Sequence, residues 1–144
     1  MKPHAEVEQV WPEGGRIRVL GRLHGLDGLP RDAASGDGWQ AVLLLREPRG
    51  PQLVYPVPVV DRSFELTVPI ADLIVPQAPA RGCWDLYLSH GETRLRVGRH
   101  LDDIRNKASI MVYPEQLIPD DERLIHVRPR YTINENLSID YWSG

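Results

Sequence analysis

The chain has 144 residues, the length of a single domain, with 42% hydrophobic residues and a net charge of −3. This charge is too small to argue for nucleic acid as a partner. The single cysteine, Cys83, excludes an internal disulfide and a zinc site built from several cysteines. No leader peptide opens the chain and no apolar run approaches the ~18 residues of a membrane span, so we expect a cytoplasmic protein.

The first part of the chain predicts two strands, residues 4–10 (HAEVEQV) and 16–23 (RIRVLGRL), joined by a turn at 11–15. Gly21 falls on the apolar face of the second strand. A glycine there indicates a bulge or the close approach of a bulky neighbour, for which Trp84 is the candidate. Residues 25–38 are rich in Gly, Asp, Ser and Pro and predict a long surface loop.

The middle of the chain continues with strands. Residues 39–46 (WQAVLLLR) form a nearly continuous apolar run, which predicts a strand buried on both faces. Pro56 and Pro58 remove two amide donors from the same side of residues 52–60, so this segment is expected at a sheet edge. Residues 63–69 (SFELTVP) alternate as a half-buried strand, and one helical turn follows at residues 70–73.

Residues 82–97 (GCWDLYLSHGETRLRV) predict a β-hairpin with its turn at residues 90–92. Apolar side chains alternate along both of its strands, so one face of the hairpin must be covered by a second sheet. Beyond it, residues 109–113 predict a short strand and residues 114–122 a loop. A second hairpin is expected from residues 123–133 and 137–142.

No window carries the spacing of an amphipathic helix, so the predicted class is all-β. About seven strands before residue 98 indicate an immunoglobulin-like antiparallel β-sandwich, with a C-terminal β-hairpin extension. We expect residues 1–98 to form the sandwich and residues 99–144 the extension packed on it. The predicted core comprises Val19, Leu44, Phe64, Leu66, Trp84, Leu86, Leu95 and Val97.

Local sequence agrees with this class and suggests a relationship. Residues 82–86 (GCWDL) resemble the Gly-x-Tyr-x-Cys start of strand F in immunoglobulin-like domains, although the disulfide cysteine and the corner tyrosine are both replaced. The runs WDLYL, RLRVGRHLDDIRNK and VRPRYTINENLSI, within residues 64–140, resemble the C-terminal β-rich accessory region of actinobacterial glycosyltransferases and CDP-glycerol glycerophosphotransferases. The resemblance implies a bacterial accessory module associated with a cell-envelope glycosyl or glycerophosphate transferase.

The candidate chemistry is sparse. His100 and Asp102 supply two metal ligands, fewer than zinc requires, so no metal and no cofactor is predicted. The Asp pairs at 102–103 and 120–121 are typical of solvated turns, and Cys83 of a small strand residue. No catalytic residues emerge, which favours a noncatalytic module. The alternative is a small standalone enzyme with a site built by loops 25–38 and 99–108.

Arginines and aromatic residues form the predicted binding surface. Arg94, Arg96 and Arg99 lie on or just after the second hairpin strand, beside Tyr87 on the first, where they could bind phosphate groups. Trp39 and Trp142 stand at strand ends and could be platforms for sugar rings, or could be buried under loops. The predicted partners are a transferase domain or an anionic glycan or polyol-phosphate polymer, with a homodimer through the C-terminal hairpin also open. No nucleic acid and no membrane span are expected.

Overall fold

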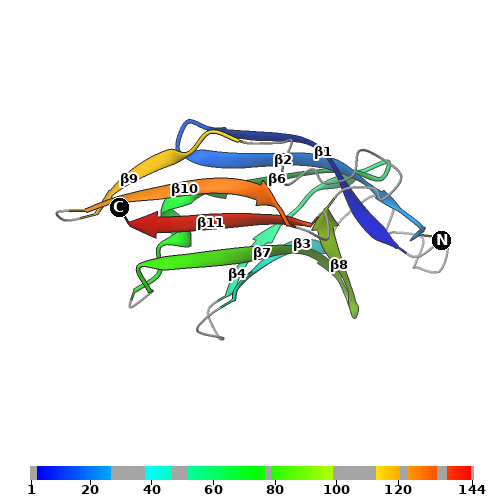
Figure 1. Ribbon diagram of the computed structural model, residues 1–144. Coiled ribbons are helices and arrows are strands. Elements are labelled where there is room, and N and C mark those ends of the chain that lie inside the picture. Colours follow the sequence, from blue (N-terminus) through cyan, green and yellow to red (C-terminus); the bar gives the residue numbers. More distant parts are fainter. Residues whose placement is uncertain are drawn as a thin grey trace.

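The computed structural model is almost entirely β-structure, which confirms the all-β prediction (Figure 1). The predicted helical turn is present as a 3-10 turn, Ile70–Leu73. No helix in this part of the chain is long and apolar enough to cross a membrane. The structure describes residues 3–26, 38–46, 52–76, 79–98, 113–120, 123–132 and 136–143.

The first sheet has the strand order β5-β6-β2-β1, all antiparallel. It forms because apolar side chains alternate along each strand and face the same layer. Its members are β1 (His4–Glu13), β2 (Arg16–His24), β5 (Val59–Val60) and β6 (Ser63–Pro69).

The second sheet is built around β7. One edge of β7 pairs with β3, which pairs in turn with β4; the other edge pairs with β11 in its first half and with β8 in its second. Strands β10 and β9 continue the sheet beyond β11. The members are β3 (Trp39–Leu45), β4 (Gln52–Pro56), β7 (Arg81–His90), β8 (Thr93–Gly98), β9 (Gln116–Asp120), β10 (Arg123–Tyr131) and β11 (Leu137–Ser143).

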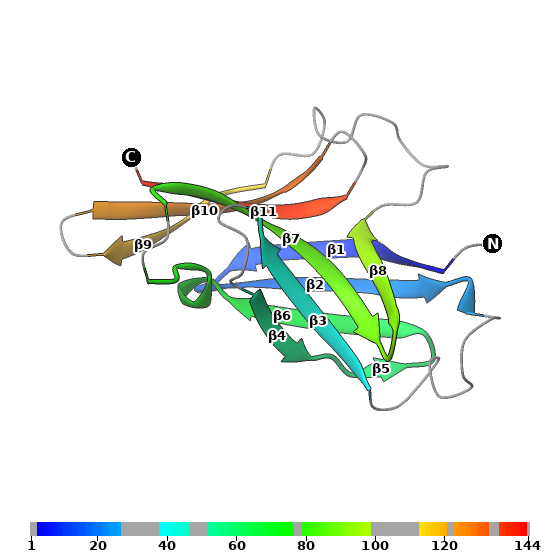
Figure 2. The ribbon, with the colours of Figure 1, turned by 90° about the horizontal axis from the view of Figure 1, so that it is seen from below.

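The two sheets stack as the layers of a sandwich, as Figures 1 and 2 show from two directions. The orders β1-β2-β6-β5 and β4-β3-β7-β8 correspond to the A-B-E-D and C′-C-F-G sheets of immunoglobulin-like domains. At one corner β8 pairs in parallel with β1, through Val97 and Ala5, and joins the layers. The immunoglobulin-like prediction is therefore confirmed.

The core lies between the layers and contains the inward-facing side chains of both sheets. Seven of the eight predicted core residues are buried in it, namely Val19, Phe64, Leu66, Trp84, Leu86, Leu95 and Val97. The prediction for Leu44 was wrong, since Leu44 is half-buried, whereas its neighbours Leu43 and Leu45 are buried. A continuous apolar run does not reveal which of its residues face inward, because the period-2 signal is missing.

Three local predictions at the β1–β2 and Gly21 positions were wrong in detail. The segment Trp11 to Glu13 belongs to β1, and the turn is Gly14 and Gly15, with φ of 67° and 78°. These left-handed values suit glycine, which has no Cβ. At Gly21 the β1–β2 register does shift, between Val7 and Gln9, but the bulky neighbour is Phe64 rather than Trp84.

The proline-rich segment and the region after the central hairpin also differ from expectation. Residues 52–60 do lie at sheet edges, but they form two strands, because the chain crosses from β4 in one sheet to β5 in the other. Residues 114–122 were predicted as a loop, whereas Gln116–Asp120 forms β9. All five residues of this segment pair with β10 in an antiparallel register, which stabilises the strand. The alternation of side chains along the segment did not reveal this pairing.

The C-terminal hairpin is confirmed as β10 and β11. Ile125, Val127, Leu137 and Ile139, apolar residues that alternate along its two strands, are all buried. It is joined to the sandwich by the pairing of β11 with β7. The division at residue 98 stays a prediction. The predicted loops 25–38 and 99–108, and most of the predicted strand 109–113, lie outside the described residues.

Candidate functional site

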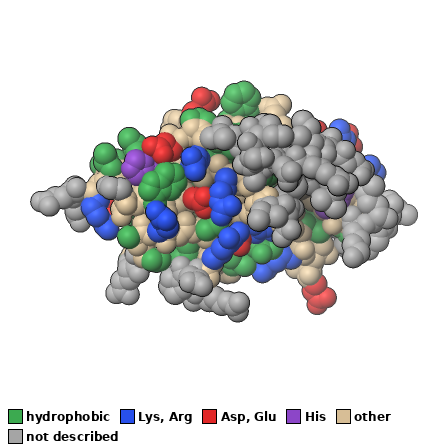
Figure 3. All heavy atoms as spheres, viewed as in Figure 1, with side chains coloured by type: hydrophobic (Ala, Val, Ile, Leu, Met, Phe, Trp, Pro, Cys, Tyr) green, Lys and Arg blue, Asp and Glu red, His purple; other side chains and the backbone are tan. Residues whose placement is uncertain are grey.

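The outward face of the second sheet gathers polar and aromatic side chains from β7, β11 and β10. Because successive strand residues point to opposite faces, every second residue on these strands faces away from the core. Figure 3 shows Lys and Arg side chains clustered on this side, interspersed with acidic ones. We call this surface the arginine face and define it by Arg46, Arg81, Cys83, Asp85, Tyr87, Arg94, Arg96, His126, Arg128, Arg130, Ser138, Asp140 and Trp142.

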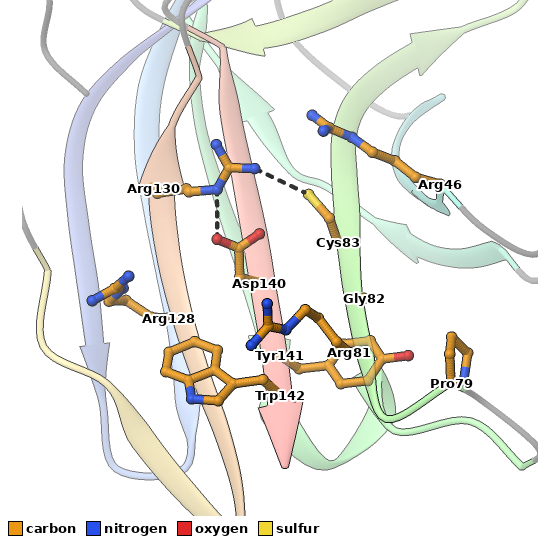
Figure 4. Close-up of a pocket in the computed structure, with 10 residues that line it drawn as sticks. All are labelled: Arg46, Pro79, Arg81, Gly82, Cys83, Arg128, Arg130, Asp140, Tyr141 and Trp142. Carbon is orange, nitrogen blue, oxygen red and sulfur yellow. Dashed lines mark hydrogen bonds and ion pairs between the residues drawn. The ribbon is translucent and has the colours of Figure 1, made fainter. Parts of the chain in front are cut away.

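A shallow cavity of about 790 Å³ lies on this face, over the first half of β7 and the adjoining β11 and β10 (Figure 4). Four guanidinium groups line it against a single carboxylate, that of Asp140. The lining residues are Arg46, Pro79, Arg81, Gly82, Cys83, Arg128, Arg130, Asp140, Tyr141 and Trp142. This excess of cations makes the cavity suited to an anionic ligand.

Two of these arginines are available for a ligand. Among the described residues, neither Arg81 nor Arg128 pairs with a carboxylate, and Arg81 is exposed. Arg130, by contrast, donates from Nε to Oδ2 of Asp140, and Arg46 is bound to Asp85. Guanidinium groups bind phosphate oxygens through paired N–H donors, so Arg81 and Arg128 are the strongest anion-binding candidates.

Trp142 supplies a flat apolar ring at the edge of the cavity. Its ring stacks on His126, with centroids 5.2 Å apart and an interplanar angle of 4°, and the Arg128 guanidinium carbon lies 5.3 Å from the ring centroid. The cross-strand pairing of His126 with Trp142 brings the two rings together. These two contacts fix the orientation of the half-buried Trp142 ring at the cavity.

Cys83 lies in the cavity wall, where its surroundings disfavour the thiolate form. Burial, reinforced by the negative charge of Asp140, raises the pKa of its thiol to about 11. Its sulphur accepts only a long contact, 3.9 Å, from Nη2 of Arg130. The thiolate that nucleophilic chemistry requires is therefore scarce at neutral pH, as expected for a strand residue.

Asp85 organises the centre of the face. Its carboxylate accepts hydrogen bonds from Arg46 Nε at 3.0 Å, Arg96 Nη2 at 2.9 Å and Ser138 Oγ at 2.8 Å. Burial alone would raise the pKa of Asp85, but the hydrogen bonds from these three residues outweigh it and the pKa is lowered. Asp85 thus stays ionised and holds strands β3, β7, β8 and β11 together.

We expect Asp85→Asn to lower the free energy of unfolding by about 2 kcal/mol at pH 7, because Arg96 then keeps a partly buried charge without its counterion. The pKa of Asp85 is lower in the folded protein, so its stabilising effect is present above the ordinary value of 3.8 and declines as the pH falls toward the lowered pKa. Urea unfolding at pH 7 and at about pH 3 should show the difference between wild type and variant shrinking at low pH.

Glu65→Gln is the matched control for this change. Its partner Arg18 is bound at 2.6 Å, but both side chains are nearly half exposed. An exposed pair contributes little, so we expect a loss below about 0.5 kcal/mol. An equal loss in both variants would contradict the organising role of Asp85.

The structure brings together three of the six predicted binding residues. Tyr87 is paired across the strands with Arg96, and the Arg94 and Arg96 guanidinium carbons lie 5.7 Å and 5.1 Å from its ring centroid. Arg96 is committed to Asp85 and Ser138, so its capacity for a ligand is reduced. Arg94 is exposed. Arg99 lies outside the described residues.

The two predicted tryptophan platforms have different environments. Trp39 is 1% exposed and contacts the His90 ring in a tilted arrangement, with centroids 5.1 Å apart, so it is a core residue and offers no ring face to a ligand. The sequence does not show whether a tryptophan at a strand end is buried or exposed, because this depends on which loop or strand packs against it. Trp142 is half-buried at the cavity.

Sequence reasoning missed the arginines that line the cavity. Arg128 and Arg130 alternate with buried Val127 and Tyr131 on β10, a pattern visible in VRPRY. That pattern shows that Arg128 and Arg130 face outward, but it does not show which strands lie beside β10. Only the β10-β11-β7 order sets them beside Arg81.

The fold and this face define the class as an immunoglobulin-like β-sandwich with a cationic, aromatic-edged cavity on one sheet. No protein-family model matches the chain, and no curated protein matches it. Solved structures do match. Crystal structures of TarS from S. aureus, a cell-wall teichoic acid glycosyltransferase, are similar to this chain.

One TarS structure superposes with a TM-score of 0.66 over 99% of this chain, at 14% sequence identity. A TarS fragment, residues 217–571, gives 0.64 over the whole chain at 13% identity. The chain spans only 25% of the first structure and 39% of the second. At this sequence identity the likeness shows a shared fold alone.

Proposed function

We propose that this chain is a noncatalytic accessory module of a cell-envelope glycosyl or glycerophosphate transferase, and that its arginine face binds an anionic glycan or polyol-phosphate polymer. The similarity to a minor part of a teichoic acid glycosyltransferase supports the association with a transferase. A polymer of this kind repeats phosphate groups along an extended chain, which suits an open strand surface better than a deep pocket.

The observation that carries the proposal is the composition of the cavity. Arg81 and Arg128 offer guanidinium groups without carboxylate partners among the described residues, and Trp142 offers a ring beside them. Phosphate and a polyol or sugar need these two kinds of contact. The raised pKa of Cys83, about 11, gives no support for covalent catalysis here.

We expect the protein to bind poly(glycerol phosphate) weakly, with affinity falling steeply as salt rises, because the site is open and the attraction is between charges. The Arg81→Ala/Arg128→Ala variant should bind at least about tenfold more weakly, since each charge-assisted hydrogen bond contributes about 1.5–3 kcal/mol before solvent screening. Isothermal titration calorimetry at 50 and 300 mM NaCl measures both effects.

Arg16→Ala/Arg22→Ala is the matched control. Both residues are exposed on β2 in the opposite sheet, so this variant removes the same charge from another surface. It should bind like wild type. If both double variants bound the polymer equally weakly, net charge alone would explain the effect. If the wild type did not bind the polymer, the proposed ligand would be refuted.

Arg94→Ala tests the other end of the face, around Tyr87. A larger loss in this variant than in Arg81→Ala/Arg128→Ala would move the site toward the second half of the central hairpin. Binding to a transferase domain but not to free polymer would instead identify the face as a protein-docking surface.

The homodimer through the C-terminal hairpin stays a prediction. Analytical ultracentrifugation of the same samples measures the oligomeric state and tests it.

A further inference from the structure

Three metal-ligating side chains meet on the outward face of the first sheet, away from the arginine face. His4 and Glu6 lie two residues apart on β1 and therefore point the same way. The antiparallel register places His24, at the end of β2, directly opposite His4. Candidate ligand atoms of all three residues lie within 4.8 Å of one another.

The side chains are already oriented toward a common point. The imidazole rings of His4 and His24 stack with centroids 4.9 Å apart and an interplanar angle of 20°. His24 Nε2 lies 2.9 Å from Glu6 Oε2. Ligands of a tetrahedral zinc ion lie about 3.4 Å apart, given bonds of about 2.0–2.2 Å, so small side-chain rotations bring all three atoms to one ion.

The donor set selects the kind of ion. Two imidazoles and one carboxylate suit zinc and its first-row neighbours, whereas calcium and magnesium prefer oxygen ligands throughout. The side chains of His24 and Glu6 are 35% and 22% exposed, so water can reach the fourth coordination position. The site is thus formed by three protein ligands with one position open to solvent.

We propose that His4, Glu6 and His24 bind one divalent ion of the zinc class. The ion clips the beginning of β1 to the end of β2, next to the corner where β1 also pairs with β8. Because binding requires the folded register of these strands, it stabilises the folded chain. This site is independent of the polymer-binding function proposed for the arginine face.

The test uses the full chain without a histidine tag. Titration with ZnCl₂ against a chromophoric chelator should show one ion bound per chain, and zinc should raise the melting temperature. His24→Ala and Glu6→Gln should each weaken binding at least about tenfold, because loss of a direct ligand exceeds the 10–100-fold effect typical of changes in its supporting hydrogen bonds. Both variants should lose the zinc-dependent rise in melting temperature.

His126→Ala is the matched control, because His126 also pairs with a carboxylate, Glu115 at 2.9 Å, and its ring stacks on a tryptophan rather than on a second imidazole. It should bind zinc as wild type does. Circular dichroism confirms that each variant is folded, and the near-isosteric Glu6→Gln guards against a folding defect in His24→Ala. Failure of wild type to bind zinc, or equal binding by wild type, His24→Ala and Glu6→Gln, would overturn the proposal.

Discussion

Trp84→Ala should lower the free energy of unfolding by about 3–5 kcal/mol, a large share of the ~5–15 kcal/mol that stabilises a typical domain. The Trp84 side chain is fully buried between the sheets, so truncation leaves a large cavity. It also removes the hydrogen bond from Nε1 to the Leu73 carbonyl, 3.0 Å long, which ties the 3-10 turn to β7. Urea denaturation at neutral pH measures the loss.

Trp11→Ala serves as the control, because Trp11 is 47% exposed and its indole N–H donates only to the neighbouring Gln9 side chain. This change should cost no more than about 0.5 kcal/mol. If Trp84→Ala cost less than about 1 kcal/mol, the central position of Trp84 in the sandwich would be refuted.

Gly21→Ala should be comparably damaging, with a loss of about 3 kcal/mol or more. A Cβ at this position would lie 2.0 Å from the backbone oxygen of Glu6 and 2.6 Å from Cζ of Phe64. The carbonyl oxygen cannot move away unless β1 separates from β2 where Val7 pairs with Gly21. Thermal and urea unfolding of the variant measure the effect.

Two companion variants identify its cause. Gly91→Ala adds a methyl group where nothing lies within 4 Å, and only its φ of 58° opposes the change, so we expect a loss of about 1 kcal/mol. Adding Phe64→Leu to Gly21→Ala relieves the ring contact but leaves the backbone one, and should not restore stability. Restoration would show that the Phe64 ring, rather than the backbone of β1, excludes a side chain.

Much of the fold could be predicted because period-2 alternation is a local property. The central hairpin, the strand at Phe64 and the C-terminal hairpin each carry their own pattern of buried and exposed residues, and all three were found. Gln116–Asp120 was missed because it lies at an outer edge, where burial is incomplete and alternation is weak. The Leu44 error has the opposite cause, since β3 is apolar on both faces.

The candidate site was less predictable, because its residues are close in space and distant along the chain. The sequence by itself determined most of the strands, the class and the outward direction of Tyr87, Arg94 and Arg96. Only the tertiary structure decided that Arg81 and Arg128 share a cavity and that His4 meets His24. Strand order and register decide which side chains from distant segments become neighbours. Both depend on how the apolar faces of the two sheets pack together, and the sequence of one segment does not contain that information.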